Sequence, residues 1–104
     1  MSVPANPLRG EATLEIAGHA HTLRPSFAAL VAAEEELGPL YALVERAGEG
    51  QLRLGEVATL FWHCLQPPTA VPREAVGEAV ARLGLARCAV PLRTLLGQIL
   101  KGTV

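Results

Sequence analysis

The spacing of hydrophobic residues divides the chain into a short first part and a longer second part. Over residues 11–16, Ala12, Leu14 and Ile16 alternate with polar neighbours, and this period of two predicts a half-buried β-strand. Gly18-His19 supplies two turn residues, and residues 20–24 are predicted to return as a second strand. A hairpin alone is marginally stable, so we expect it to pack on the rest of the chain.

After Pro25 the hydrophobic residues recur every three or four positions, which predicts helices. Ser26 is placed to cap the first of them, and Gly38 to end it. Proline cannot continue a helical hydrogen-bond ladder, so Pro67-Pro68 marks a stop. Pro91 is predicted in the first turn of the last helix, with residues 85–90 as a connector. The predicted helices are 27–37, 40–47, 55–65, 72–83 and 91–100.

These elements predict an α+β fold in which an N-terminal two-stranded β-hairpin is followed by four or five short helices. Residues 1–10 carry Pro4, Pro7 and Gly10 and are predicted to form an irregular arm, and residues 11–104 a single domain. In the first helix the hydrophobic residues that recur at helical spacing are Phe27, Leu30, Val31 and Leu37. In the third helix one stripe holds Val57, Leu60, Phe61, Cys64 and Leu65.

Composition supports a helical chain and excludes several kinds of chemistry. Alanine and leucine, the strongest helix formers, contribute 34 of the 104 residues, and aspartate is absent. An Asp-based calcium loop and a Ser-His-Asp triad are therefore excluded. The net charge is −1 and no basic stretch stands out, so we expect no nucleic-acid partner. No hydrophobic run reaches membrane-spanning length and no signal peptide is recognised, which predicts a cytoplasmic protein with reduced cysteines.

Histidine and cysteine offer the first candidate chemistry. His19 and His21 would share one face of a strand, and with His63 and Cys64 they could bind zinc if the hairpin tip reached the third helix. A zinc site would need all four side chains around one ion, and solvated turn histidines are the favoured interpretation. Cys64 next to His63 could be a nucleophile, but neighbouring helical residues do not face each other, so a buried structural thiol is favoured. The same interpretation applies to Cys88.

Two other groups have both a functional and a structural interpretation. Glu34, Glu35 and Glu36 could form a paired-carboxylate site, but consecutive helical residues point in different directions, so a solvated acidic face is favoured. Such a face could also receive a basic partner segment. Gly48-Glu49-Gly50 lacks the context of a phosphate-binding loop. We therefore expect no enzyme activity, no cofactor and no bound metal.

Phe61-Trp62 holds two of the four aromatic residues of the chain. If Phe61 belongs to the core, Trp62 points elsewhere, either towards a partner or under the hairpin or the Pro67-Pro68 loop. Phe61, Trp62 and Leu65 are the predicted partner-binding residues. The edges of the hairpin could also pair with a second copy by strand addition, which would give a homo-oligomer.

Several sequence runs resemble one known family. They are Asn6-Pro7-Leu8-Arg9-Gly10-Glu11, then Leu23-Arg24-Pro25-Ser26-Phe27-Ala28-Ala29-Leu30, then Leu37-Gly38 and Gly50-Gln51-Leu52-Arg53-Leu54. Together with the alternating hairpin they are similar to the gene-transfer-agent family of small phage-tail proteins. The resemblance covers most of the chain and weakens after Pro67. Its motifs mark structure and carry no catalytic residue.

The resemblance implies a role in building a long-tailed particle. The family is usually regarded as a tail assembly chaperone, which would hold the helical tape-measure protein until tail-tube subunits polymerise around it. Tail-tube subunits are a second implied partner. The alternative is a structural tail or tail-tube component that is retained in the particle. We favour the chaperone because one short hairpin offers little sheet for a tube.

Overall fold

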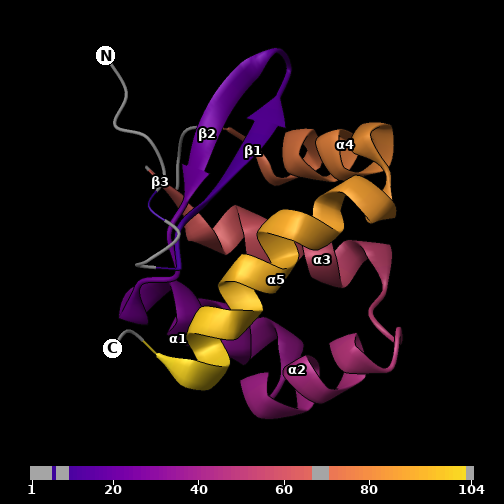
Figure 1. The fold of residues 1–104 in the computed structure, drawn as a ribbon. Helices are drawn as coiled ribbons and strands as arrows, with labels where there is room; N and C mark the ends of the chain where they lie inside the picture. The colour runs from indigo at the N-terminus through magenta and orange to yellow at the C-terminus, as the bar shows by residue number, and fades with distance from the viewer. Residues whose placement is uncertain (1–5, 7–9, 67–70, 103–104) are drawn as a thin grey trace.

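The computed structural model describes residue 6 and residues 10–66 and 71–102. It confirms an α+β fold, in which a β-hairpin precedes five helices (Figure 1). The Pro67-Pro68 stop, and most of the predicted N-terminal arm, lie outside the described residues. In chain order the elements are β1 (Ala12–Ile16), β2 (His19–Leu23), α1 (Phe27–Leu37), α2 (Leu40–Gly48), α3 (Leu54–Cys64), β3 (Leu65–Gln66), α4 (Arg73–Leu83) and α5 (Leu85–Lys101).

The hairpin is confirmed, and its turn lies one residue earlier than predicted. β1 and β2 are antiparallel, with Ile16 opposite His19, so His19 belongs to the strand and not to the turn. The two connecting residues, Ala17 and Gly18, have φ angles of 52° and 84°. Positive φ at both positions matches the right-handed twist of the strands, which explains why this pair forms the turn. Ala12, Leu14 and Ile16 are buried, as the alternation predicted.

A third strand follows α3, and the sequence analysis missed it. β3 pairs antiparallel with β2, with Thr22 opposite Gln66 and Leu23 opposite Leu65. The helix predicted over 55–65 therefore ends one residue early, at Cys64. Gln66 precedes a proline, and residues in that position favour extended backbone. β3 covers the end of β2 at Thr22 and Leu23, so this edge of the hairpin is less open than predicted.

Ser26 and Glu34 define the ends of α1 and the start of α2. The Ser26 hydroxyl accepts a hydrogen bond of 3.2 Å from the Ala29 N–H, which confirms the predicted N-cap. At the other end, Gly38 donates to the Glu34 carbonyl. The Glu34 carboxylate then accepts the Leu40 N–H at 3.1 Å, so one residue connects the two helices.

The prediction for Pro91 was wrong. α5 begins at Leu85, directly after Gly84, and Pro91 lies inside the helix. The early start buries Cys88, whose Sγ lies 3.9 Å from the Val80 carbonyl oxygen of α4. Proline inside a helix costs one backbone hydrogen bond, and the burial of Cys88 before Pro91 and of Leu95 after it offsets that loss. α5 then runs across the molecule from α4 towards α1 (Figure 1).

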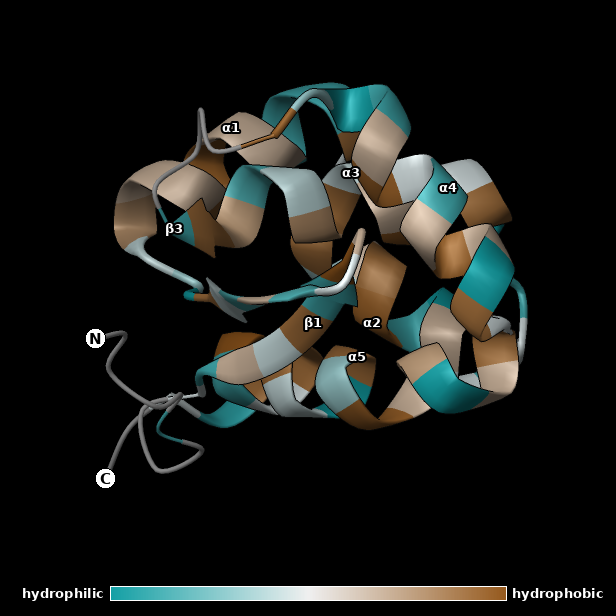
Figure 2. Cartoon of the chain, turned by 90° about the horizontal axis from the view of Figure 1, so that it is seen from above, coloured by the Kyte–Doolittle hydropathy of each residue, from teal (hydrophilic) through white to brown (hydrophobic). Residues whose placement is uncertain are grey.

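One hydrophobic core joins all of these elements except β3's polar end, and α3 lies at its centre. The predicted stripe of α3 is entirely buried, from Val57 to Cys64, and Leu65 of β3 continues it. The four residues that recur at helical spacing in α1 divide into two pairs. Leu30 and Leu37 are partly buried against the core, whereas Phe27 and Val31 are exposed, and the fully buried residues of the helix are Ala29 and Ala33. Figure 2 shows hydrophobic residues in all of the helices, and the large ones that are exposed to solvent include Phe27 and Tyr41.

Candidate functional site

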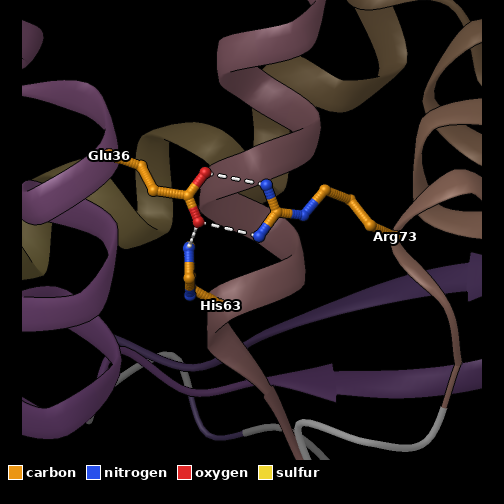
Figure 3. Close-up of polar contacts among 3 residues, drawn as sticks. All are labelled: Glu36, His63 and Arg73. Carbon is orange, nitrogen blue, oxygen red and sulfur yellow. Dashed lines mark hydrogen bonds and ion pairs between the residues drawn. The ribbon is translucent and has the colours of Figure 1, made fainter.

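Three polar side chains that are far apart in the sequence meet beside α3. Glu36 comes from α1, His63 from α3 and Arg73 from the start of α4 (Figure 3). Arg73 donates two hydrogen bonds of 2.7 Å to the two carboxylate oxygens of Glu36, and His63 Nε2 lies 2.8 Å from Glu36 Oε1. This cluster links three helices, and we refer to it as the Glu36–His63–Arg73 brace. Glu36 had been predicted to lie on a solvated acidic face, whereas its carboxylate is hydrogen-bonded within the protein.

The electrostatics of this cluster favour a structural role. The hydrogen bonds from Arg73, and then the one to His63, lower the pKa of Glu36 from 4.5 to about 2. A general base near neutral pH needs a pKa close to the working pH and an oxygen that is free to accept a proton. Both Glu36 oxygens already have partners, so the carboxylate is suited to bracing helices rather than to proton transfer.

Trp62 lies next to this brace and is half-buried. Its Nε1 donates a hydrogen bond of 3.2 Å to the Val71 carbonyl, and the guanidinium carbon of Arg73 lies 4.3 Å from the centre of its ring. His63 contacts the indole edge-on, with 4.9 Å between ring centres. Trp62 is thus engaged by its own chain at both its ring and its N–H.

Phe61 and Leu65 are fully buried, which corrects the expectation that they are exposed to a partner. Phe61 shares the inner face of α3 with Leu60 and Cys64, and Leu65 lies in β3 against Leu23. α3 packs mainly against α4 and α1, so the inner face that holds Phe61 is covered by these two helices. Of the three predicted residues, Trp62 alone keeps part of its surface open.

The predicted candidate zinc ligands, His19, His21, His63 and Cys64, do not form a metal-binding group in the structure. Cys64 is buried, and desolvation raises the pKa of its thiol to about 12, which disfavours the reactive thiolate. Burial also raises the pKa of Cys88. Among the described residues, no group of three or more His, Cys, Asp or Glu side chains is arranged to hold a metal ion.

An apolar groove lies on the surface between α1, α2 and α5. Its first part has a volume of about 380 Å³ and contains Phe27, which is 85% exposed, and Tyr41, which is 68% exposed. Isolated exposed apolar residues are common, but a continuous set of them indicates a binding surface. This part is lined by Phe27, Leu30, Val31, Glu34, Leu40, Tyr41, Val44, Ile99 and Leu100.

The groove continues along α5. Val44 and Leu100 also line a second part, of about 510 Å³, between α2 and α5. Much of its lining consists of small residues, which keep the surface hollow. This part is lined by Val44, Ala47, Gly48, Ala89, Leu92, Arg93, Leu96, Gly97 and Leu100. We refer to the two parts together as the α1–α2–α5 groove.

One feature of the sequence of α1 indicates this groove. Residues 27–33 of α1 read Phe-Ala-Ala-Leu-Val-Ala-Ala, so the helix is apolar on all sides over two turns. A helix that faces one core needs an apolar stripe on one side only. The side of α1 that does not face the core is therefore also apolar, and it lines the groove with Phe27 and Val31.

No single helix among the described residues is long and apolar enough to cross a membrane. α4 and α5 reach the necessary length and composition only as a pair, with a bend of 119° between them.

Comparison with known proteins places the chain in a family. No curated protein and no solved structure gives a significant match. The family described as "Phage tail tube protein, GTA-gp10" matches residues 9–102, which is nearly the whole chain and includes the hairpin, the brace and the groove. The protein therefore belongs to this gene-transfer-agent and phage tail family.

Proposed function

We propose that the protein is a tail assembly chaperone, and that its α1–α2–α5 groove holds a helical, apolar segment of the tape-measure protein during tail assembly. The observation that carries the proposal is the exposure of Phe27, Tyr41 and Leu100 around one groove. Large apolar side chains in solvent favour a partner that covers them. A groove between helices suits an amphipathic helix, which is one of the common ways of binding a peptide.

The rest of the described surface supports binding rather than catalysis. The Glu36–His63–Arg73 brace uses its polar atoms internally, and the two thiols are buried. We therefore also propose that the protein is not an enzyme.

The second candidate is a tail-tube component that stays in the finished particle, and the description of the family favours it. Tube subunits build rings from sheets with several long strands. Among the described residues the strands have five, five and two residues, which supports the chaperone over the tube subunit.

Co-expression with a tape-measure protein from the same source tests the proposal. We expect a soluble complex with several copies of this chain on each tape measure, measured by pull-down and light scattering. Mass spectrometry of purified tails should then lack this chain. If the tape measure stays insoluble and this chain instead assembles into rings or tubes, the tube-component function replaces the proposal.

A further inference from the structure

The α1–α2–α5 groove has two charged lining residues, and they lie in different parts of it. Glu34 lines the part between α1, α2 and the end of α5, and Arg93 lines the part along the middle of α5. All other lining residues are apolar side chains, Tyr41 or glycine. In the part of the chain that the structure describes, no carboxylate forms an ion pair with Arg93.

The dimensions of the groove match a short helix. Its lining on α5 runs from Ala89 to Leu100, which corresponds to about 16 Å at a helical rise of about 1.5 Å per residue. The same length accommodates about three turns of a bound helix. Gly48 and Gly97 form part of the lining, and a Cβ added at either position would meet no atom within 4 Å. The backbone of a partner can therefore approach closely.

These observations specify the partner more narrowly than apolar character alone. Resting on the proposed function, we infer that the groove binds an amphipathic helix of about three turns that carries a cationic side chain at the Glu34 end and an anionic side chain at the Arg93 end. Complementary charges at the rim of an apolar contact set orientation and selectivity more than total affinity. The apolar stripe supplies affinity, and the two charges decide which helices are accepted.

The shape of the surface favours a helix over a second copy of this chain. A second copy that docked through the same face would present the same hollow surface, and two hollow surfaces leave unfilled space between them. A helix presents a convex ridge, which fits between α2 and α5. Self-association through this face is therefore an outcome that would overturn the inference.

Three synthetic peptides of about 18 residues, long enough to form helix in isolation, test the charge pattern. All three carry the same apolar stripe of about three turns, and they differ only in the charged residues at the two ends of that stripe. One has Lys at one end and Glu at the other, one has Lys at both ends, and one has Glu at both ends. Binding to the full chain is measured by fluorescence anisotropy. We expect the mixed peptide to bind about two- to five-fold more tightly than either of the others, as exposed ion pairs allow.

Charge variants of the protein should change this order in a defined way. Arg93→Glu should make the peptide with Lys at both ends the tightest binder. Glu34→Gln keeps an oxygen that can accept the Leu40 N–H, and should remove the penalty against the peptide with Glu at both ends. Arg87→Glu and Glu35→Gln change exposed charges on the same helices outside the groove lining, and should leave the order unchanged.

The outcomes separate this inference from the proposed function. Equal binding of the three peptides, or the same change in the control variants, would overturn the charge pattern. Absence of peptide binding together with concentration-dependent dimerisation through Leu100 would assign the groove to a second copy. Binding in the expected order, with a tape measure that nevertheless stays insoluble, would support the inference and contradict the chaperone proposal.

Discussion

Helices α1 and α3 are equally long and have similar hydrophobic repeats, yet they use them in opposite ways. Each has 11 residues. α3 buries its large side chains, including Leu60 and Phe61, at the centre of the core. α1 packs against α3, fully buries only Ala29 and Ala33, and leaves Phe27 in solvent. A hydrophobic stripe therefore identifies a helix face that is covered by other residues, and these can belong to the core of the same chain or to a partner.

Truncation of the two phenylalanines should show the largest difference between these helices. Phe61→Ala leaves a cavity in the core and should lower the free energy of unfolding by about 3–5 kcal/mol. Phe27→Ala removes a side chain that is already in solvent and should change it by less than about 0.5 kcal/mol. Urea denaturation of both variants measures this. Similar losses would mean that α1 belongs to the core as α3 does.

Helix α5 also has one side covered by its own chain and one side that lines the groove. On the covered side Gly10 lies against Gln98: its φ is +74°, and an added Cβ would overlap the Gln98 side chain. Gly10→Ala should therefore lower the free energy of unfolding by about 3 kcal/mol, from backbone strain and overlap together. Gly50→Ala is the matched control, because its φ is +70° and its added Cβ meets nothing. It should lose only about 1 kcal/mol in the same denaturation experiment.

The brace between α1, α3 and α4 should contribute less, because Glu36 is 41% exposed. Its folded pKa of about 2 lies below the ordinary value of 4.5, so its contribution is complete above about pH 4.5 and is lost as the pH falls towards 2. Glu36→Gln should cost no more than about 1 kcal/mol at pH 7. Arg46 also lowers the pKa of Glu56, so some acid sensitivity remains in the variant.

Unfolding at pH 7 and pH 3 tests this directly. The wild type should lose more stability between the two values than Glu36→Gln does. An identical loss in both proteins would show that the brace contributes no pH-dependent stability.

The smallest change in stability is expected for a glycine in the groove, Gly97, and its replacement should also change the binding of the partner. Gly97→Ala in α5 should raise the free energy of unfolding by about 0.5–1 kcal/mol, because alanine is the better helix former and its Cβ meets no atom. The same methyl group narrows the groove and should weaken partner binding. Gly77→Ala in α4, also with an unobstructed Cβ, should stabilise the protein without affecting binding. Equal binding by both variants would contradict the assignment of the groove.

Much of the fold could be predicted from local patterns. The alternation through Ile16 and the cap at Ser26 are decided by neighbouring residues, and both were confirmed. β3 has only two residues and depends on pairing with β2, which no local pattern shows. Pro91 was assigned to a helix start because an isolated helix would favour it there. Burial of Cys88 extends the helix past that position.

The candidate site was less accessible to the sequence. Glu36 and Arg73 are 37 positions apart, so their hydrogen bonds depend on how α1 and α4 pack. The hydrophobic residues of the groove were visible in the sequence, but their repeat could not tell an inward face from an outward one. The fully buried positions in α1 are alanines, whereas the larger residues Phe27 and Val31, which recur at helical spacing, are exposed.

The central claim is that the α1–α2–α5 groove is the surface that holds the tape-measure protein. Leu100 and Leu85 both lie in α5 and are both 52% exposed, but only Leu100 lines the groove. The most direct measurement is the amount of soluble tape measure after co-expression with Leu100→Gln or Leu85→Gln. The account predicts a clear loss with Leu100→Gln and a wild-type amount with Leu85→Gln. Wild-type amounts with both variants, or equal losses, would contradict it.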